Sequence, residues 1–271
     1  MDQRTAQIGK VYLIGAGPGD PELLTLKAAR AIASSDVIFY DDLVNPEVLT
    51  HARRGVELVY VGKRAGAHSR AQADINRMLV ERARRGQTVG RIKGGDPFIF
   101  GRGGEEAIAL AEASINWEVV PGISSGAAAA AYAGIPLTHR DHSSSVAFIT
   151  GHQSQFQAGR KIDWAEAARL ADTLVIFMCA GTIAAIARAL VEGGRAPSTP
   201  MALIRWATYD HQEVYAGTLE ELINRGEIKI ETPAIAIIGA VAALEKRLRW
   251  FGRQSLYRSL KDIEVIDHAV A

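Results

Sequence analysis

The sequence predicts an α/β protein built of two domains. Short apolar runs rich in Val and Ile alternate with helical patterns through the first half of the chain, as in a mostly parallel sheet covered by helices. The stretch GIPLTHRDHSSS, which begins at Gly134, interrupts this alternation with Pro, Ser and charged residues, and strands resume after it. We therefore expect an N-terminal α/β domain over residues 1–138 and a C-terminal α/β domain over residues 139–271.

The elements expected in the first domain alternate regularly. Strands are expected where β-branched and aromatic residues cluster, and helices where apolar residues recur every third or fourth position. In the stretch 71–85, for example, Ile75, Met78 and Leu79 fall on one helical face. The expected strands cover residues 11–14, 37–40, 58–61, 89–92 and 118–120, and the expected helices cover residues 22–33, 46–53, 71–85, 104–113 and 124–133.

The second domain is expected to contain a mixed sheet. Strands are expected at residues 146–150, 174–178 and 202–206. The runs EVYAGTL and PAIAIIGAV follow with only a short helix between them, which favours some antiparallel pairing. After Trp250 the chain is charged and weakly patterned, and we expect a final helix with loose ends.

Composition narrows the class of protein. The chain has 271 residues, 48% hydrophobic and 23% charged, which is typical of globular domains with a sizeable core. Its 31 basic and 30 acidic residues leave a net charge of +1, so no overall field favours nucleic acid or an anionic membrane. The single cysteine, Cys179, excludes an intramolecular disulfide and fits a reducing compartment. No apolar run is long enough to span a bilayer and the N-terminus lacks a signal-peptide core, so we expect a cytoplasmic protein without nucleic-acid or membrane partners.

The first expected strand runs into a glycine-rich loop, GAGPGDPE, which begins at Gly15. Gly15 and Gly17 match the first two glycines of a dinucleotide fingerprint, but the third position holds Asp20. Pro18 also removes a backbone N–H that a phosphate would need. Asp20 instead suits a helix N-cap, with Pro21 at the first helical position. A diphosphate site is therefore disfavoured. A turn without any ligand accounts for Asp20 and Pro21, but not for the clustered glycines at the carboxyl end of a strand.

Two further loops repeat this pattern of Gly and Pro after a strand. GGDPFIFGRGGEE begins at Gly94, after the fourth expected strand, and PGISSGAAAA begins at Pro121, after the fifth. Backbones without side chains can approach a ligand closely, and open α/β sheets bind ligands at the carboxyl ends of their strands. The three loops together predict a ligand-binding crevice.

These loops resemble those of the tetrapyrrole methylases, which use S-adenosyl-L-methionine. The matching segments run from about Lys10 to Ala242 and are GAGPGDPELLTLKA, YDDLV, VGKR, GRIKGGDPFIFGRGGEE, PGISSGAAAAAYAGIPLTHR and TGH. The resemblance implies the tetrapyrrole methylase fold, which has two α/β domains with the cofactor cleft between them, usually in a homodimer. It also implies contacts with S-adenosyl-L-methionine, and with S-adenosylhomocysteine as its product, at Pro18, Gly94, Gly95, Asp96, Ile99, Ser124, Ser125, Met178 and Ala207.

The complete set of segments is similar to those family members that methylate uroporphyrinogen III. The implied reaction adds methyl groups at C2 and C7 and gives precorrin-2, by way of precorrin-1, for sirohaem or cobalamin synthesis. In each transfer a pyrrole carbon attacks the sulfonium methyl group, so the protein mainly positions the reactants and manages protons. The resemblance implies a proton acceptor at Asp41 and a proton donor at Lys63. From the residues alone, the ordinary interpretation is a turn or N-cap carboxylate for Asp41 and a solvated loop charge for Lys63.

The residues leave several roles open around such a site. A polycarboxylate substrate calls for basic groups, and candidates that follow expected strands are Arg64, Arg91, Lys93, Arg102, Arg140 and Arg205. For Asp96, an N-cap role fits as well as a ligand contact. The three histidines near the expected junction lack the spacing of a metal site, so no metal is expected; they are His139, His142 and His152.

Three other functions remain to be weighed against this one. A later precorrin methyltransferase would share the fold, the cofactor and the loops. A nicotinamide-dependent oxidoreductase would use Asp36 or Asp41 to hold a ribose, but the third fingerprint glycine is missing. A non-catalytic binding module would keep cofactor affinity without turnover. Because the resemblance starts by Lys10, we also expect the dehydrogenase–chelatase module of some sirohaem-making relatives to be absent, and a separate enzyme to oxidise or metallate the product.

Overall fold

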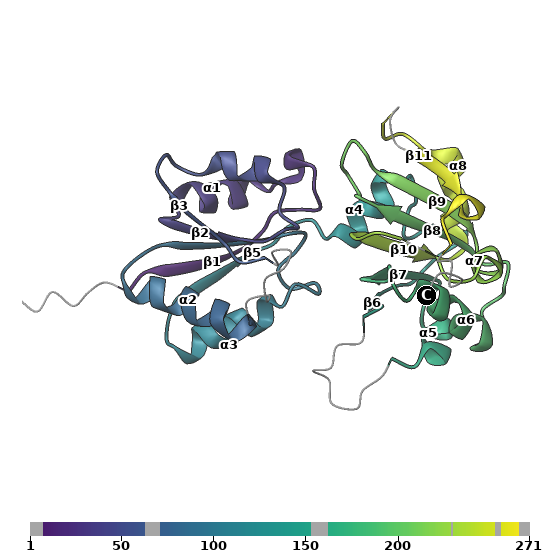
Figure 1. Ribbon diagram of the computed structural model, residues 1–271, viewed down its shortest axis with the longest axis horizontal. Coiled ribbons are helices and arrows are strands. Elements are labelled where there is room, and N and C mark those ends of the chain that lie inside the picture. Colours follow the sequence, from purple (N-terminus) through teal and green to yellow (C-terminus); the bar gives the residue numbers. More distant parts are fainter. Residues whose placement is uncertain (1–7, 63–70, 153–161, 229, 253–255, 266–271) are drawn as a thin grey trace, which may run out of the picture. The chain divides into compact units, whose positions relative to one another are not determined.

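The computed structural model describes residues 8–62, 71–152, 162–228, 230–252 and 256–265. The chain divides into two compact units, residues 1–125 and 126–271, and each contains one β-sheet with helices packed on it (Figure 1). Both sheets were expected from the alternating sequence pattern. Lys63, the predicted proton donor, and Arg64 lie outside the described residues.

The first unit contains a five-stranded sheet in the order β3-β2-β4-β1-β5. Its strands are β1 (Lys10–Gly15), β2 (Val37–Tyr40), β3 (Glu57–Tyr60), β4 (Val89–Lys93) and β5 (Asn116–Val120). Every paired neighbour in this sheet is parallel. The carboxyl ends of all these strands, and the loops that follow them, therefore lie along one edge of the sheet.

Helices cover both faces of this sheet. They are η1 (Pro21–Leu23), α1 (Leu26–Ser34), η2 (Pro46–His51), α2 (Gln72–Arg84) and α3 (Gly103–Glu112). In Figure 1, α1 lies on one face and α2 and α3 lie on the other. Alternate side chains of β1 separate accordingly, since Leu13 packs with Leu79 of α2 whereas Ile14 packs with Ile32 of α1. The buried strands thus read as continuous apolar runs because both faces are covered.

The helix expected over residues 22–33 is two elements. Asp20 caps η1, accepting a hydrogen bond from the backbone N–H of Glu22 at 2.8 Å, which confirms its predicted capping role. Leu24 is extended, with ψ at 130°, so the first turn ends there. Thr25 then caps α1 and accepts a hydrogen bond from Ala28 N at 3.1 Å. A second cap so close to the first restarts the helix rather than continuing it.

The second unit contains a six-stranded mixed sheet in the order β11-β9-β8-β10-β7-β6. Its strands are β6 (Val146–Thr150), β7 (Thr173–Phe177), β8 (Pro200–Arg205), β9 (Glu213–Thr218), β10 (Ala234–Ile238) and β11 (Leu256–Ser259). β10 is antiparallel to both β7 and β8, and β8 is antiparallel to β9, which confirms the mixed sheet. The predicted C-terminal helix is wrong, because residues 256–259 pair with β9 as a parallel edge strand.

The helical elements of this unit pack on both faces of its sheet. They are α4 (Ser125–Tyr132), α5 (Trp164–Leu170), α6 (Ile183–Glu192), α7 (Leu219–Arg225), η3 (Ala240–Leu244), α8 (Glu245–Leu248) and η4 (Leu260–Asp262). Leu174 and Ile176 of β7 join a core cluster with Ile183 of α6 and Leu222 of α7. α5 and α6 are not among the elements expected from the sequence.

The boundary between the compact units falls after Ser125, the first residue of α4, whereas the sequence placed the junction beyond this helix, at residues 138 and 139. α4 packs against the second sheet so closely that a Cβ atom on Gly126 would lie 2.5 Å from Cζ of Phe177 and 3.0 Å from Val175. The alanines that follow, Ala128 to Ala130, are buried. The proline and charges that suggested the junction belong instead to a surface turn that follows α4.

Cys179 follows β7 and is completely buried. Burial raises the pKa of its thiol to about 12, so thiolate is scarce at neutral pH. We expect the native protein to resist alkylation by iodoacetamide near neutral pH and to react once unfolded in urea. Mass spectrometry would count the adducts, and rapid labelling of the native chain would contradict this burial.

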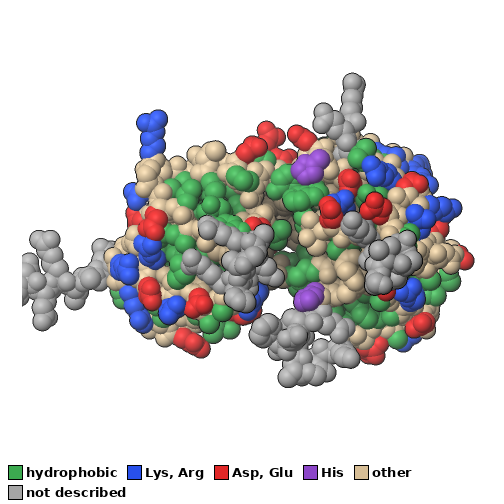
Figure 2. All heavy atoms as spheres, viewed as in Figure 1, with side chains coloured by type: hydrophobic (Ala, Val, Ile, Leu, Met, Phe, Trp, Pro, Cys, Tyr) green, Lys and Arg blue, Asp and Glu red, His purple; other side chains and the backbone are tan. Residues whose placement is uncertain are grey.

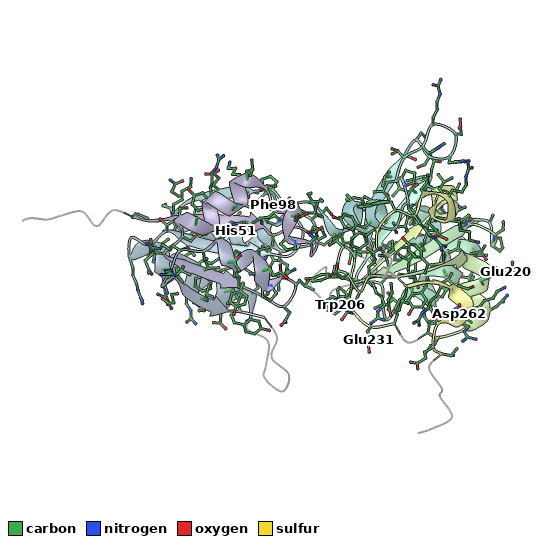
Figure 3. All side chains as sticks on the ribbon, turned by 90° about the horizontal axis from the view of Figure 1, so that it is seen from above. His51, Phe98, Trp206, Glu220, Glu231 and Asp262 are labelled. Atoms are coloured by element: carbon green, nitrogen blue, oxygen red, sulfur yellow. The ribbon has the colours of Figure 1, made fainter. Side chains whose placement is uncertain are left out.

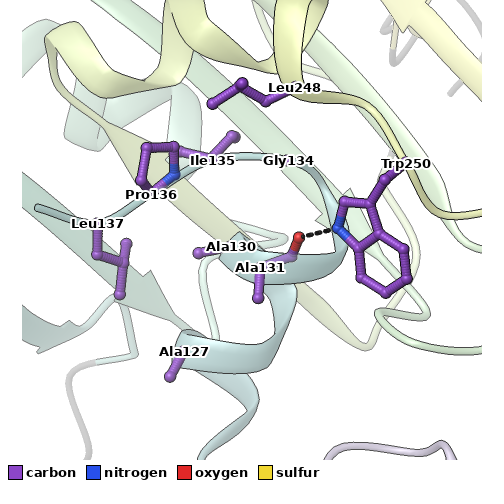
Figure 4. A pocket seen from close by; sticks show the side chains of 9 residues that line it. All are labelled: Ala127, Ala130, Ala131, Gly134, Ile135, Pro136, Leu137, Leu248 and Trp250. Atoms are coloured by element: carbon purple, nitrogen blue, oxygen red, sulfur yellow. Dashed lines mark hydrogen bonds between the residues drawn. The ribbon is translucent and has the colours of Figure 1, made fainter. Parts of the chain in front are cut away.

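No described helix is both long and apolar enough to cross a membrane. On the face drawn in Figure 2, basic and acidic side chains are interspersed on both units, in keeping with the net charge of +1. An apolar groove of about 420 Å³ lies on the second unit, beside α4 and the Trp250 side chain, whose Nε1 donates to Ala131 O at 2.8 Å (Figure 4). None of the residues predicted to bind a cofactor lines this groove.

Candidate functional site

The loops that follow β1 and β4 are joined by their backbones at the carboxyl edge of the first sheet. Gly95 N donates to Gly17 O at 2.6 Å, and Gly17 N donates to Gly95 O at 3.2 Å. Both glycines have positive φ, 80° for Gly17 and 69° for Gly95, a region that L side chains rarely adopt. The glycines expected from the sequence to form a ligand crevice are therefore needed to bring the two loops together.

The loop after β5 joins the same cluster. A Cβ atom on Gly122 would lie 2.3 Å from Gly95 O and 2.8 Å from the backbone of Gly15. The converse holds for Gly15, where a Cβ would lie 2.5 Å from Gly122 N. Three backbones thus meet at distances that leave no room for a side chain. We call Gly15, Gly17, Gly95 and Gly122 the glycine cluster.

Asp96 links two of these loops through its carboxylate. Oδ1 accepts a hydrogen bond from Phe98 N at 2.8 Å, and Oδ2 accepts one from Gly122 N at 3.1 Å. The first bond closes a local turn and is not the helix N-cap that the sequence left open, since the described residues 97–102 form turns and bends and α3 begins only at Gly103. The second bond spans from the β4 loop to the β5 loop. Asp96 therefore holds the glycine cluster together, whichever group a ligand presents to it.

Ser124 offers a hydrogen-bonding group that the described part of the protein does not use. Its Oγ is buried and has no hydrogen-bond partner among the described residues. A buried hydroxyl without a partner costs free energy, so such a group in a native protein calls for a missing partner such as a ligand or water. Ser125 N lies beside Gly95, 3.4 Å from where a Cβ would stand. The predicted cofactor residues Pro18, Gly94, Gly95, Asp96, Ile99, Ser124 and Ser125 thus all lie in the loops at this edge.

The remaining predicted cofactor residues, Met178 and Ala207, belong to the second unit. β7 and β8 are both antiparallel to β10, so they run in the same direction and end at the same edge of their sheet. Met178 follows β7 with φ at 52° and is 49% exposed. Ala207 lies between two residues with positive φ, Trp206 at 47° and Thr208 at 72°. Trp206 is labelled in Figure 3. Positive φ in residues other than Gly is uncommon and concentrates at functional sites.

A buried side chain holds the loop that contains Ala207. Gln212 is completely buried; its Oε1 accepts a hydrogen bond from Thr208 N at 2.9 Å, and its Nε2 donates to Tyr132 O at 3.2 Å. The loop conformation is therefore built into the fold of the second unit.

Asp41, the predicted proton acceptor, follows β2 at the carboxyl edge of the first sheet. Its side chain is 25% exposed, and its Oδ2 accepts a hydrogen bond from Arg91 Nη2 at 2.9 Å. Its Oδ1 accepts a weaker bond from Leu43 N at 3.3 Å, and a Cβ on Gly94 would lie 2.8 Å from that leucine. Asp41 therefore lies near the predicted cofactor loop while still reaching solvent.

Two of the predicted substrate-binding bases are buried instead of exposed. Arg91 is 3% exposed and Lys93 is 5% exposed, and both donate to one oxygen of Glu106, at 3.1 Å and 3.0 Å. Their expected place on a basic rim is wrong, because β4 is covered by helices on both faces and these side chains point into that covering. Glu106, which is completely buried, was missed by the sequence analysis.

The other predicted bases have different surroundings. Arg102 pairs with Glu105 at 2.7 Å, and Arg205 pairs with Glu231 at 2.6 Å. Arg140 is exposed, and Arg64 is outside the described residues. Within the described ranges, no group of three or more His, Cys, Asp or Glu side chains is placed to hold a metal ion.

Lys93 contributes to stability in a pH-dependent way. Burial lowers its pKa below the ordinary 10.5, and the neighbouring charge of Arg91 lowers it further, against the attraction of Glu106. The unfolded chain therefore binds this proton at a pH where the folded protein has lost it, so the unfolding free energy rises with pH between the lowered pKa and 10.5. Below that interval the penalty of burying the charge is fully present.

We expect the unfolding free energy of the wild type, measured in urea, to increase relative to that of Lys93→Met as the pH is raised toward 10.5. The comparison between the two proteins removes the contributions of other lysines. Parallel curves would contradict a lowered pKa at Lys93.

Comparisons with known proteins agree with this geometry. The sequence pattern of the Tetrapyrrole (Corrin/Porphyrin) Methylases matches residues 10–223. The chain is 50% identical to the uroporphyrinogen-III C-methyltransferase of Bacillus subtilis over 246 residues, which cover 90% of this chain and 95% of that protein. It is also 50% identical to siroheme synthase 2 of Aeromonas salmonicida over 94% of this chain, but spans only about half, 52%, of that relative's length.

The fold is shared with a solved methyltransferase. The crystal structure of uroporphyrin-III C-methyl transferase from Thermus thermophilus, complexed with S-adenyl homocysteine, aligns with a TM-score of 0.75 at 40% identity. That alignment covers 87% of this chain and 94% of the Thermus chain. The family pattern, the relatives and the fold all agree with the resemblance of the glycine loops, and the chain belongs to the tetrapyrrole (corrin/porphyrin) methylases.

Proposed function

We propose that this chain is an S-adenosyl-L-methionine-dependent C-methyltransferase that methylates uroporphyrinogen III at C2 and C7, giving precorrin-2 by way of precorrin-1. The observation that carries the proposal is the glycine cluster, where three strand-end loops meet backbone to backbone in a chain 50% identical to nearly the whole of a uroporphyrinogen-III C-methyltransferase. Family membership supports the fold and the reaction class, and the proposed substrate comes from that relative.

The residues present fit a cofactor with mixed polar groups. S-Adenosyl-L-methionine carries an amino group, a carboxylate and a sulfonium, so its site needs donors, acceptors and close backbone approach. The glycine cluster supplies the close approach, and Ser124 supplies a buried hydroxyl that lacks a partner in the described structure. The residues that the proposal assigns to the cofactor are Pro18, Gly94, Gly95, Asp96, Ile99, Ser124, Ser125, Met178 and Ala207.

When bound, the cofactor supplies an electrophilic methyl group. The protein's part is to orient the pyrrole carbon toward that methyl group and to exclude water, which lowers the barrier chiefly by positioning. Methyl transfer releases the thioether and leaves a positive charge on the macrocycle, which is neutralised by loss of a proton from a position other than the newly methylated carbon. Asp41 is the proposed acceptor of that proton because its carboxylate is partly exposed and is oriented by Arg91. Lys63 keeps its proposed role as proton donor on the strength of the resemblance alone.

An assay with the purified chain tests the reaction. Uroporphyrinogen III and methyl-labelled S-adenosyl-L-methionine are expected to give a macrocycle that carries two labelled methyl groups, with a singly labelled intermediate at early times. Turnover of a later precorrin, with none of uroporphyrinogen III, would favour the alternative methyltransferase. Quenching of protein fluorescence by a nicotinamide dinucleotide, with no methyl transfer, would favour the oxidoreductase.

We also propose that the chain acts as a homodimer, as the resemblance implies. Light scattering during size-exclusion chromatography is expected to give twice the mass of the chain, and a monomer that retains full activity would refute this. Nucleic acids and membranes are not proposed as partners, and a cytoplasmic location stays a prediction from the sequence.

A further inference from the structure

Four charged side chains form a continuous chain from the partly exposed Asp41 into the interior of the first unit. Arg91 donates from Nη2 to Asp41 at 2.9 Å and from Nε to Glu106 Oε1 at 3.1 Å. Lys93 donates to the same Oε1 at 3.0 Å. The remaining nitrogen of Arg91, Nη1, donates to Ile92 O at 2.8 Å, so the guanidinium is held on three sides.

Glu106 is the residue on which this arrangement converges. It is completely buried on α3, and its Oε1 also accepts a hydrogen bond from Gln72 of α2 at 3.2 Å. Its Oε2 has no hydrogen-bond partner within the described part of the chain. Elements β4, α2 and α3 therefore all meet at one carboxylate oxygen, which fixes where Arg91 can lie.

Stability alone is a poor reason for such a cluster. Taking these charges out of water costs free energy that their mutual attraction regains only with good geometry, and well-packed apolar residues often serve as well or better. Among the described residues, the cluster also leaves one buried carboxylate oxygen without a hydrogen-bond partner. Its one partly exposed member is Asp41, with a side chain 25% exposed, at the carboxyl edge of the sheet where the glycine loops meet.

We propose that Glu106 is a positioning residue for methyl transfer: it fixes the guanidinium of Arg91, and Arg91 in turn fixes the carboxylate of Asp41. Glu106 touches no reactant in this scheme. Glu106 acts through two hydrogen bonds, both donated by Arg91: one to Glu106 and one to Asp41. The inference rests on the proposed function, since it assigns Asp41 to the reaction.

A double-mutant cycle on kcat tests this coupling. Glu106→Gln is expected to lower kcat by about tenfold to a hundredfold, the size expected when a charge-assisted hydrogen bond that aims a catalytic group is lost. In an Asp41→Asn background the same change is expected to have little further effect, because the carboxylate to be aimed is gone. If the two fold-changes simply multiply, Glu106 does not act through Asp41 and the proposal fails.

Asp74→Asn is the matched control. Asp74 lies on the adjacent helix α2, its carboxylate is also paired with an arginine, Arg77, at 2.9 Å, and both side chains are exposed to solvent. The control is expected to keep kcat within about twofold, since exposed ion pairs contribute little. In Glu106→Gln, affinity for S-adenosylhomocysteine is expected to be unchanged, and loss of this affinity together with kcat would indicate general disruption and overturn the proposal.

A readout independent of activity separates this inference from the proposed function. The Nε–H proton of Arg91, identified by its absence in Arg91→Lys, is expected to exchange slowly in the wild type and in Asp74→Asn, and rapidly in Glu106→Gln. Unchanged exchange in Glu106→Gln would overturn the positioning role even in an active enzyme. Absence of methyl transfer in the wild type, with the exchange result as expected, would count against the proposed function alone.

A charge-balanced background covers the case in which Glu106→Gln does not fold. In Lys93→Met/Glu106→Gln, Arg91 and Asp41 remain as one cation and one anion, so the pair stays neutral. Compared with Lys93→Met alone, the double variant is expected to lose kcat by the same factor. Equal kcat in these two proteins would overturn the proposal.

Discussion

Replacing Asp41 by Asn is expected to lower kcat for methylation of uroporphyrinogen III by about 10²–10⁴-fold, the usual contribution of a positioned general base. The amide keeps the size of the side chain but cannot accept a proton. Arg91 keeps its bonds to Glu106 and to Ile92 O, so the first unit should stay folded. The measurement is the single-turnover rate with both substrates saturating, together with calorimetric binding of S-adenosylhomocysteine, which should be unchanged.

Asp42→Asn provides the matched control for this loss. Asp42 is adjacent, exposed, and bonded to the Tyr60 hydroxyl instead of to the buried cluster. Its substitution is expected to change kcat only slightly. Wild-type turnover in Asp41→Asn would refute the role of Asp41, and equal losses in both variants would mean that the loop, and not the one carboxylate, is required. Retained cofactor affinity with lost turnover would also exclude a non-catalytic binding module.

Gly122→Ala is expected to have the second large effect. The added methyl group would lie 2.3 Å from Gly95 O and 2.8 Å from the backbone of Gly15, and the three atoms nearest to it all belong to the backbone, which cannot move aside as a flexible side chain would. The loops must separate, which also strains the bond from Gly122 N to Asp96. We expect the unfolding free energy to fall by about 1–3 kcal/mol, as for other overpacked sites. Affinity for S-adenosylhomocysteine should fall about tenfold or more, because a displacement of the binding loops misplaces several contacts at once.

Gly104→Ala is the control for adding a methyl group at a glycine. A Cβ on Gly104 would meet nothing within 4 Å, and the residue lies in the first turn of α3. Ala is favoured over Gly inside a helix by about 0.5–1 kcal/mol, so stability should be equal or slightly higher. Urea denaturation and calorimetry measure both variants. If Gly122→Ala binds the cofactor product as tightly as Gly104→Ala does, the glycine cluster is not part of the cofactor site.

The sequence predicted the first unit well because its inner strands, β1, β2 and β4, are largely buried on both faces. A run such as that in β2, expected at residues 37–40 and found at Val37–Tyr40, needs no knowledge of its partners. The prediction was wrong where an edge strand formed after Trp250, since β11 depends on pairing with a distant β9 and has little apolar pattern of its own. The sequence-based prediction also joined η1 and α1 into one helix. The break between them is a single extended residue, Leu24, and one extended residue does not interrupt the helical spacing of apolar residues.

The candidate site shows the same division. The glycine loops and Asp41 were found because Gly, Pro and Asp at the ends of strands can be recognised locally. Such residues let a backbone approach a ligand, and ligands bind at the carboxyl ends of strands in open α/β sheets. Glu106 was missed because it stands beside Glu105 in the sequence, and only the packing of α3 on β4 buries one and exposes the other. Arg91 and Lys93 were assigned to the surface for the same reason, since charged residues are rarely buried unless they are paired.

By itself, the sequence determined the class of fold, the family and the loops that make the site, because each of these rests on residues that are neighbours along the chain. The tertiary structure alone decided that Gly15, Gly95 and Gly122 touch one another, that Asp96 joins two of their loops, and that a buried carboxylate stands behind Asp41. Those relations join strands and helices far apart in sequence. They depend on which face of the sheet each side chain occupies and on how closely two backbones pack. Neither property can be read from one segment of the sequence, because each involves segments that meet only in the folded protein.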